Sequence, residues 1–128
     1  QKTWDKQVKV GLGTDIGAGT SFNQLQTVSE AYKVQQLQGN KLSAFESLYH
    51  VTLGGAKALD LDDKLGNFTV GKEADFVVLN LNATALQTLR QQRAKHIEDA
   101  LFALFTMGDD RNIQATYIFG QKAYEQSA

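Results

Sequence analysis

The chain has 128 residues, a formal net charge of -1 and 42% hydrophobic residues, enough for one core and with no reason to expect two independently folding domains. Its lysines and arginines are scattered among acids and glutamines, so we expect neither nucleic acid nor a membrane surface as a partner. The absence of cysteine excludes disulfides, a thiol nucleophile and cysteine-based metal sites, and is compatible with a cytoplasmic location. No apolar run approaches the roughly 20 residues of a membrane-spanning helix.

The N-terminal part of the chain predicts a strand and then a helix. Apolar residues alternate with other residues over 8–12, a pattern typical of a short strand. Ser21 and Gln24 have the spacing of a capping box, which satisfies free N–H groups at the start of a helix. Apolar residues then recur at helical spacing, which predicts a helix over residues 22–38 with Gly39 just beyond its end.

A second helix is predicted from another capping box. Ser43 and Glu46 have the required spacing, and apolar residues follow on one face. We expect Gly54 and Gly55 to interrupt this helix, and one more helical turn to follow over residues 56–59.

The second half of the chain predicts strands around one buried helix. The expected elements are a strand over residues 75–81, an ambiguous polar stretch over 84–92, a helix over 97–105, and a hairpin of residues 113–119 and 122–125 that turns at Gly120 and Gln121. The helix is apolar over most of its circumference, so we expect it to be buried. The order strand, two helices, strand, helix, hairpin indicates an α/β protein.

Asp15 is the strongest candidate for a chemical role. It follows the predicted strand in a glycine-rich loop before a helix, and α/β proteins place reactive acidic side chains at the carboxyl ends of strands. The same position suits an aspartate that forms a turn or assists a helix cap, and spacing alone favours this structural role. The glycines fit neither the dinucleotide-binding pattern nor a P-loop, which disfavours phosphate binding.

The histidines and the acidic pairs are weaker candidates. His50 and His96 could join Asp15 around a metal ion, but the chain lacks an H-x-H pair, so we expect a helix residue and a helix-start residue instead. Two acidic pairs in glycine-flanked loops are predicted to be solvated turn and capping residues: Asp62 with Asp63, and Asp109 with Asp110. These residues alone do not make a complete active site.

Three stretches of the chain match the sequence pattern of a known protein superfamily, and the length of the last one makes a chance match improbable. They are Gly13-Thr-Asp15, Leu53-Gly-Gly-Ala-Lys-Ala-Leu59 and Gly66-Asn-Phe-Thr-Val-Gly-Lys-Glu-Ala-Asp-Phe-Val-Val-Leu79. Together they resemble the carboxy-terminal third of the amidohydrolase superfamily of metal-dependent hydrolases. The loop over residues 13–22 and the endings over 107–113 and 116–120 are similar, within that superfamily, to the guanine deaminases.

This resemblance implies an α/β fold that is the C-terminal part of a (β/α)8 TIM barrel together with part of a small β-sandwich. Residues 1–63 would hold the last barrel strand and the outer helices. Residues 64–82 and 112–126 would be strands of the sandwich. Residues 83–111 would form a helical segment packed between the two parts.

The resemblance also implies zinc-dependent deamination of guanine to xanthine and ammonia by an enzyme that is a homodimer at full length. Asp15 matches the family aspartate at the end of the eighth strand, so it would be both catalytic and a zinc ligand. The other zinc ligands, the proton-shuttling glutamate and the purine-recognising groups would lie outside this chain.

One consequence of the resemblance is that the chain would be a fragment, inactive alone and prone to self-association or strand exchange. The alternatives are an aminohydrolase of the same superfamily that acts on another heterocycle, or a stand-alone, non-catalytic interaction module.

Overall fold

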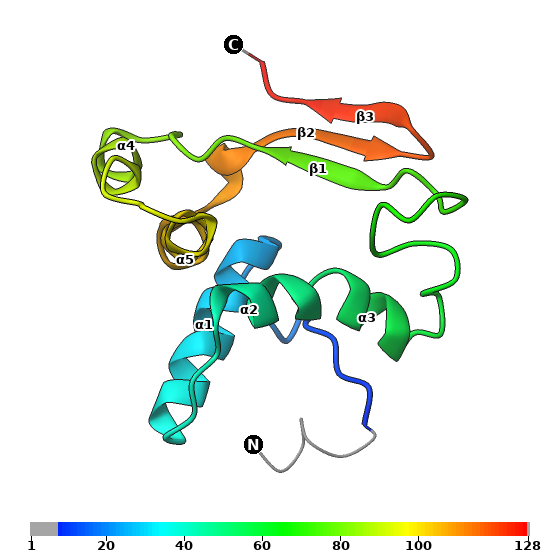
Figure 1. The fold of residues 1–128 in the computed structure, drawn as a ribbon, viewed down its shortest axis with the longest axis horizontal. Helices are drawn as coiled ribbons and strands as arrows, with labels where there is room; N and C mark the ends of the chain where they lie inside the picture. Colours follow the sequence, from blue (N-terminus) through cyan, green and yellow to red (C-terminus); the bar gives the residue numbers. More distant parts are fainter. Residues whose placement is uncertain (1–7, 128) are drawn as a thin grey trace.

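The computed structural model describes residues 8–127 of the chain. In chain order the elements are α1 (Gln24–Leu37), α2 (Ala44–His50), α3 (Leu53–Ala58), β1 (Phe76–Leu79), α4 (Ala85–Gln91), α5 (Ile97–Met107), the short 3-10 helix η1 (Asp110–Asn112), β2 (Ile113–Ile118) and β3 (Gln121–Glu125). The three strands form one antiparallel sheet in the order β1-β2-β3. Figure 1 shows α2 and α3 running below this sheet, with α4 and α5 at one end of it.

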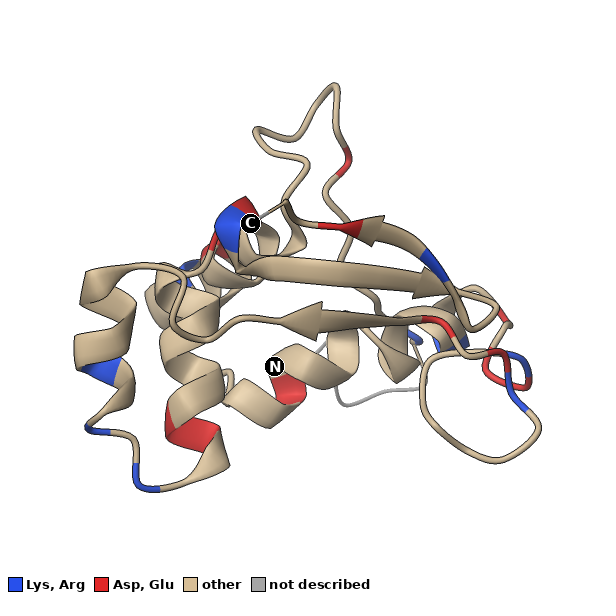
Figure 2. Cartoon of the chain, turned by 90° about the horizontal axis from the view of Figure 1, so that it is seen from above, with Lys and Arg blue, Asp and Glu red and all other residues tan. Residues whose placement is uncertain are grey.

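The sheet joins two segments that are far apart in the sequence. β1 pairs with β2 in antiparallel register, with Phe76 opposite Tyr117. The rings of these two residues stack with centroids 4.5 Å apart and an interplanar angle of 10°. β3 then pairs with β2, and Figure 2 shows the three strands side by side. Aromatic pairing across the strands therefore helps to fix the register of β1 on β2.

The hairpin turns one residue earlier than predicted, at Phe119 and Gly120 instead of Gly120 and Gln121. Both residues have positive φ, 52° and 72°, as a two-residue type I′ turn requires. The Phe119 N–H donates to Asp75 Oδ1 at 2.8 Å, and the Gly120 N–H donates to the Ala74 carbonyl at 3.0 Å. The residues just before β1 thus hold the turn in place, a tertiary contact that local sequence does not reveal.

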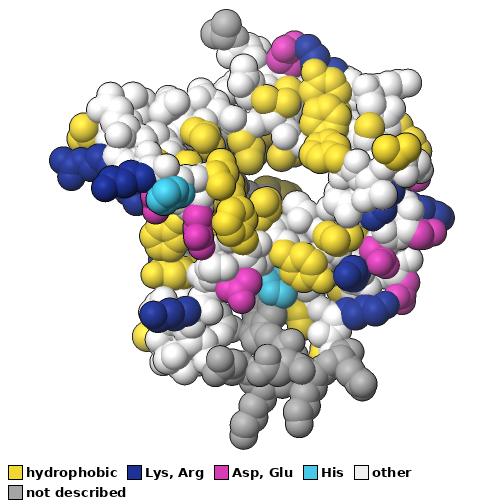
Figure 3. All heavy atoms as spheres, in the orientation of Figure 1, with side chains coloured by type: hydrophobic (Ala, Val, Ile, Leu, Met, Phe, Trp, Pro, Cys, Tyr) yellow, Lys and Arg dark blue, Asp and Glu magenta, His cyan; other side chains and the backbone are white. Residues whose placement is uncertain are grey.

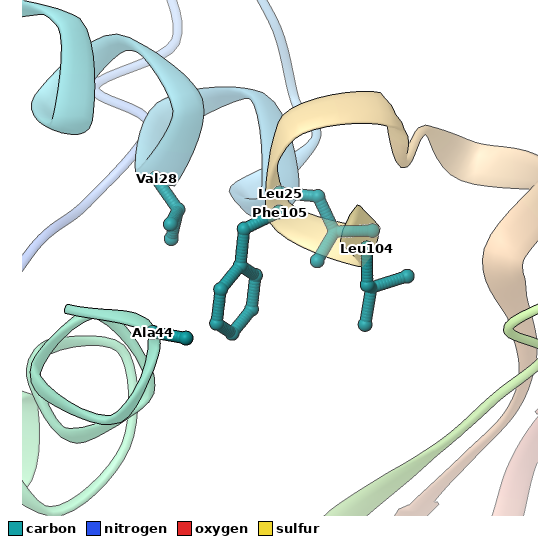
Figure 4. Packing of buried hydrophobic residues seen from close by; sticks show 5 residues of the cluster. All are labelled: Leu25, Val28, Ala44, Leu104 and Phe105. Atoms are coloured by element: carbon teal, nitrogen blue, oxygen red, sulfur yellow. The ribbon is translucent and has the colours of Figure 1, made fainter. Parts of the chain in front are cut away.

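The hydrophobic core lies between α1, α2 and α5. Its most buried members are Val28 from α1 and Leu104 from α5, each 1% exposed. Figure 4 shows these two side chains with Leu25, Ala44 and Phe105, which converge from the three helices. Truncation of a fully buried leucine costs about 2–5 kcal/mol of unfolding free energy. This core therefore holds α1 and α2 together, and Leu12, from the segment that leads to Asp15, packs against it.

The predicted strand over residues 8–12 is not formed as a strand. The segment is extended but makes no ladder with another strand among the described residues. A strand requires a neighbour to pair its N–H and C=O groups, and the alternation of apolar residues cannot supply one. The backbone groups of this segment are bonded to α1 and α2 instead.

Helix α1 begins later than the predicted residue 22. Asn23 is the N-cap, and its Oδ1 accepts from the Leu25 N–H at 2.8 Å. Ser21 Oγ accepts from the Asn23 N–H at 2.9 Å, so the hydroxyl orders the turn before the helix and does not cap it. Asparagine is as good an N-cap as serine, and the chain places it one helical position before Gln24.

Helix α2 has the predicted capping box. Ser43 Oγ accepts from the Glu46 N–H at 3.2 Å, and Glu46 Oε2 accepts from the Ser43 N–H at 2.8 Å. The predicted interruption at Gly54 and Gly55 is wrong. The helical path breaks earlier, between the end of α2 at His50 and the start of α3, and both glycines lie inside α3.

The second half of the chain contains two helices, of which α5 extends beyond its predicted end. The ambiguous stretch 84–92 forms α4, because Thr84 Oγ1 caps it by accepting from the Gln87 N–H at 3.2 Å. α5 continues to Met107 and is buried at Ala103, Leu104 and Phe105, whereas its first residue, Ile97, is 61% exposed. Among the described residues, none of the helices has the length and apolar character needed to cross a membrane.

Candidate functional site

Asp15 lies at the first corner of a tight loop between the extended segment and α1. Its φ is 45°, in the left-handed region that non-glycine residues rarely occupy. The Asp15 carbonyl accepts from the N–H groups of Ala18 at 3.0 Å and Gly19 at 2.5 Å. An isolated bridge between Ile16 and Gly19 closes the loop. The backbone of Asp15 is therefore held by the loop that follows it.

Gly19 is required by the close return of this loop. A Cβ atom placed on Gly19 would lie 1.8 Å from the Thr14 carbonyl oxygen, far inside van der Waals contact. No residue with a side chain fits there without moving the backbone on either side of Asp15. This steric demand accounts for Gly19 without any phosphate ligand.

The carboxylate of Asp15 is available to a ligand. The residue is exposed, and its side chain makes no hydrogen bond or ion pair with any of residues 8–127. Its side chain therefore caps no helix, whereas its backbone, with positive φ and a carbonyl bonded to the Ala18 and Gly19 N–H groups, forms the turn that spacing favoured. A carboxylate held on a restricted backbone and left unpaired can bind a metal ion or accept a proton.

The segment leading to Asp15 is tethered to α1 and α2 by three contacts. The Leu12 N–H donates to the His50 carbonyl at 3.0 Å, and His50 Nδ1 lies 3.1 Å from the Val10 carbonyl oxygen. Gln24 Nε2, from the first turn of α1, donates to the Leu12 carbonyl at 2.8 Å. These contacts satisfy alternate backbone groups that a neighbouring strand would otherwise pair.

The structure does not bring the two histidines to Asp15. His50 ends α2 and contacts the Val10 carbonyl, and His96 is the exposed N-cap residue of α5. Within residues 8–127 no group of three or more His, Asp or Glu side chains is placed to hold a metal ion. The described residues thus form no metal site by themselves.

The acidic pairs have the structural surroundings that the sequence predicts. Asp109 caps η1 and binds Arg111, whose Nε lies 3.0 Å from Asp109 Oδ1. The side-chain hydrogen bond from Arg111 holds the pKa of the Asp109 carboxyl below its usual value. Asp62 and Asp63 lie in the polar turn after α3. Figure 2 shows acidic and basic residues spread over many elements instead of gathered at one site.

Sequence reasoning missed the part that Gln24 plays near the site. The capping-box spacing assigned its side chain to the helix start, whereas the structure directs it to the Leu12 carbonyl. No local pattern marks such a contact, because its two partners meet only when α1 packs beside the extended segment.

A sequence model described as the amidohydrolase family matches residues 1–123. The chain belongs to the amidohydrolase family. The match includes the Asp15 loop, the helices beside it and the terminal sheet up to the middle of β3.

Several relatives within the family are similar over almost the whole chain. Guanine deaminase of Escherichia coli (strain K12) is 59% identical over 127 residues, which cover 99% of this chain and 29% of that protein. The solved structure of E. coli guanine deaminase matches with a TM-score of 0.96 at 60% identity, over 98% of this chain and 30% of that one. A guanine deaminase from Bradyrhizobium japonicum matches with a TM-score of 0.91 at 34% identity, over 98% of this chain and 34% of that one.

A more distant structural relative is an adenosine deaminase from Xanthomonas campestris, solved with bound zinc. It matches with a TM-score of 0.63 at 27% identity, over 80% of this chain and 22% of that one. The chain spans about a third or less of the length of all these proteins. The predicted fold class is confirmed: the chain has the α/β structure of part of an amidohydrolase TIM-barrel enzyme.

Proposed function

We propose that the chain is the carboxy-terminal part of a guanine deaminase, which hydrolyses guanine to xanthine and ammonia. The observation that carries this proposal is the 59% identity with E. coli guanine deaminase over 99% of the chain. The TM-score of 0.96 with the corresponding structure supports it, because the Asp15 loop and the packing around it lie within the matched region.

We propose zinc as the metal of the whole enzyme, with Asp15 as one of its ligands. An exposed carboxylate without a protein partner fits such a role, and zinc accepts Asp oxygens together with histidine nitrogens. A zinc site takes three or four protein ligands, so the remaining ones would come from residues outside the described part of this chain. When bound, zinc would supply a Lewis acid that activates water for hydrolysis.

The role proposed for Asp15 uses both of its oxygens. One oxygen would contact the metal, and the other would accept the proton of the attacking water and deliver it to the departing amine. In the net reaction a C–O bond forms, the C–N bond to the exocyclic nitrogen breaks, and that nitrogen leaves as ammonia. The restricted backbone at Asp15, with φ of 45°, would limit the movement of the Cα from which the carboxylate extends during this transfer.

We propose the same division of the chain as the sequence predicts. Residues 1–63 would complete a TIM barrel, and residues 64–82 and 112–126 would complete a β-sandwich, with 83–111 between them. Large apolar side chains of the chain face solvent on both parts, including Phe22 at 82%, Leu37 at 88% and Phe68 at 80% exposed. Figure 3 shows apolar side chains around a hollow between the sheet and the helices. Further protein packed on these surfaces would remove them from water.

The exposed apolar surfaces of the chain also bear on its assembly. We propose that the full-length enzyme is a cytoplasmic homodimer, and that the isolated 128-residue chain is inactive and self-associates or exchanges strands. Sedimentation of the isolated chain as a compact monomer, or formation of xanthine by it, would contradict the second proposal.

The experiment that tests the proposed function is an Asp15→Asn substitution in the whole protein that contains this chain. We expect the loss of guanine deamination and of most bound zinc, measured by xanthine formation and by metal analysis. Asp63→Asn is the matched control, because Asp63 is an exposed aspartate in another loop, and it should leave both values unchanged. Retention of wild-type zinc content and activity in Asp15→Asn would overturn the proposal.

A second candidate function is deamination of an adenine compound. The match with the X. campestris adenosine deaminase favours it, although the identity of 27% is well below that with the guanine deaminases. Parallel assays of the whole protein with guanine and adenosine distinguish the two candidates, and we expect turnover of guanine only.

A further inference from the structure

The backbone that leads to Asp15 is hydrogen-bonded to one side chain from α1. Leu12 precedes Asp15 by three residues in a segment that lacks strand partners among the described residues. Its carbonyl oxygen accepts a hydrogen bond from Gln24 Nε2 at 2.8 Å. Gln24 is the first residue of α1, so this bond joins the segment before the Asp15 loop to the helix after it.

The backbone of this segment also makes hydrogen-bonding contacts with His50 of α2. His50 accepts from the Leu12 N–H through its carbonyl, and its Nδ1 contacts the Val10 carbonyl. Because a carbonyl oxygen only accepts, the second contact is a hydrogen bond when Nδ1 carries the proton. Both contacts come from α2. Gln24 therefore supplies the hydrogen bond between this segment and α1, and the Leu12 side chain also packs against the core cluster that contains Leu25 and Val28 of that helix.

Asp15 lies in the loop whose two ends are Leu12 and Gln24. Between Leu12 and Gln24 the backbone makes the tight return in which the Asp15 carbonyl binds the Ala18 and Gly19 N–H groups. The two ends of the loop are thus joined by the Gln24 side chain and its centre is closed by backbone bonds. These bonds restrict the paths that the backbone at Asp15 can take.

We propose that Gln24 is a positioning residue that sets the affinity of the Asp15 carboxylate for its metal ion, an inference that rests on the proposed function. Residues that orient a metal ligand without touching the metal change metal affinity when they are substituted. Gln24 acts on Asp15 through the Leu12 carbonyl and has no chemical role of its own.

The test compares Gln24→Met with Gln26→Met in the whole protein. Methionine keeps the length of glutamine and its helix propensity but removes the hydrogen-bond donor. Gln26 lies two residues further along α1 and is exposed, and its side chain makes no hydrogen bond within residues 8–127. We expect Gln24→Met to raise the zinc dissociation constant roughly tenfold, and Gln26→Met to leave it unchanged within about twofold. The constant is measured by competition of the metal-free protein with a chromophoric chelator.

A second measurement separates positioning from stability. The thermal unfolding midpoints of the two metal-free variants should coincide, because a positioning role changes the site and not the packing. A Gln24→Met protein that binds zinc like wild type, or that fails to fold, would overturn the proposal. Measuring Asp15→Asn in the same series distinguishes failure of the positioning role from failure of the proposed function. If Asp15→Asn loses zinc but Gln24→Met does not, the positioning role of Gln24 is wrong and the proposed function stands. If Asp15→Asn binds zinc with wild-type affinity, both the positioning role and the proposed function are wrong.

Discussion

Gln87 and Asn112 exchange two amide hydrogen bonds in the interior, although they lie on different elements. Gln87 Nε2 donates to Asn112 Oδ1 at 3.1 Å, and Asn112 Nδ2 donates to Gln87 Oε1 at 3.0 Å. Asn112 also donates to the Asn80 carbonyl and accepts from the Asp109 N–H. The pair is 4% and 0% exposed, so none of these groups has water as a substitute partner. This network ties α4, η1 and the end of β1 together.

The network predicts a large stability loss for Asn112→Ala. The substitution leaves several buried polar groups without partners, and we expect the unfolding free energy of the whole protein to fall by about 2–4 kcal/mol. Gln114→Ala, at an exposed position of β2, is the control and should change it by less than about 0.5 kcal/mol. Urea unfolding measures both. Equal effects of the two substitutions would contradict a special contribution of the buried amide pair.

The Asp15 loop predicts that Gly19→Ala is destabilising. The new Cβ would lie 1.8 Å from the Thr14 carbonyl oxygen, so the loop must open. We expect a loss of about 1–3 kcal/mol, typical of local backbone strain. In Gly13→Ala the added Cβ meets nothing within 4 Å, and this neighbouring glycine is the matched control. Thermal unfolding of both variants checks the prediction, which fails if Gly19→Ala is as stable as Gly13→Ala.

The core predicts that Leu104→Ala removes a central contact between α5 and α1. Leu104 is 1% exposed, and we expect a loss of about 2–5 kcal/mol of unfolding free energy from the lost burial and the cavity left behind. Leu86→Ala deletes the same atoms at a position that is 64% exposed, and should cost less than about 1 kcal/mol. Unfolding curves of the two variants make the comparison. If Leu86→Ala lowers the unfolding free energy as much as Leu104→Ala does, the assignment of Leu104 to the core is wrong.

The capping box of α2 predicts a pH dependence that resides in Glu46. Hydrogen bonds from the Ser43 backbone and side chain lower the pKa of Glu46 from 4.5. A carboxyl with a lowered pKa in the folded state contributes stability above its unfolded pKa, and this contribution is lost as pH falls through the folded pKa. Stability should therefore decline below about pH 4.5 in wild type, and less steeply in Glu46→Gln.

The control for this prediction is Glu30→Gln, at an exposed glutamate of α1. Its unfolding midpoint should follow pH with the wild-type slope, and thermal unfolding between pH 3 and 6 provides the measurement. A Glu46→Gln protein with the wild-type slope would show that the capping box does not titrate as described.

The sequence determined those features that depend on neighbours along the chain. The α2 capping box needs only Ser43 and Glu46 at the right spacing, and the structure forms it as predicted. The burial of Ala103, Leu104 and Phe105 in α5 follows from the apolar composition of that helix in the same way. Asp15 could be singled out from its glycine-rich loop, although its chemical role stays a proposal.

Tertiary structure decided the features that need a partner distant in sequence. Residues 8–12 have a strand pattern but no strand beside them among the described residues, so their backbone binds His50 and Gln24. The hairpin turn lies at Phe119 and Gly120, one residue before the predicted position, where Asp75 accepts a hydrogen bond from the Phe119 N–H group. Local propensity fixes what a segment can form, but each backbone donor and acceptor must find a partner, and that partner is present only in the folded molecule.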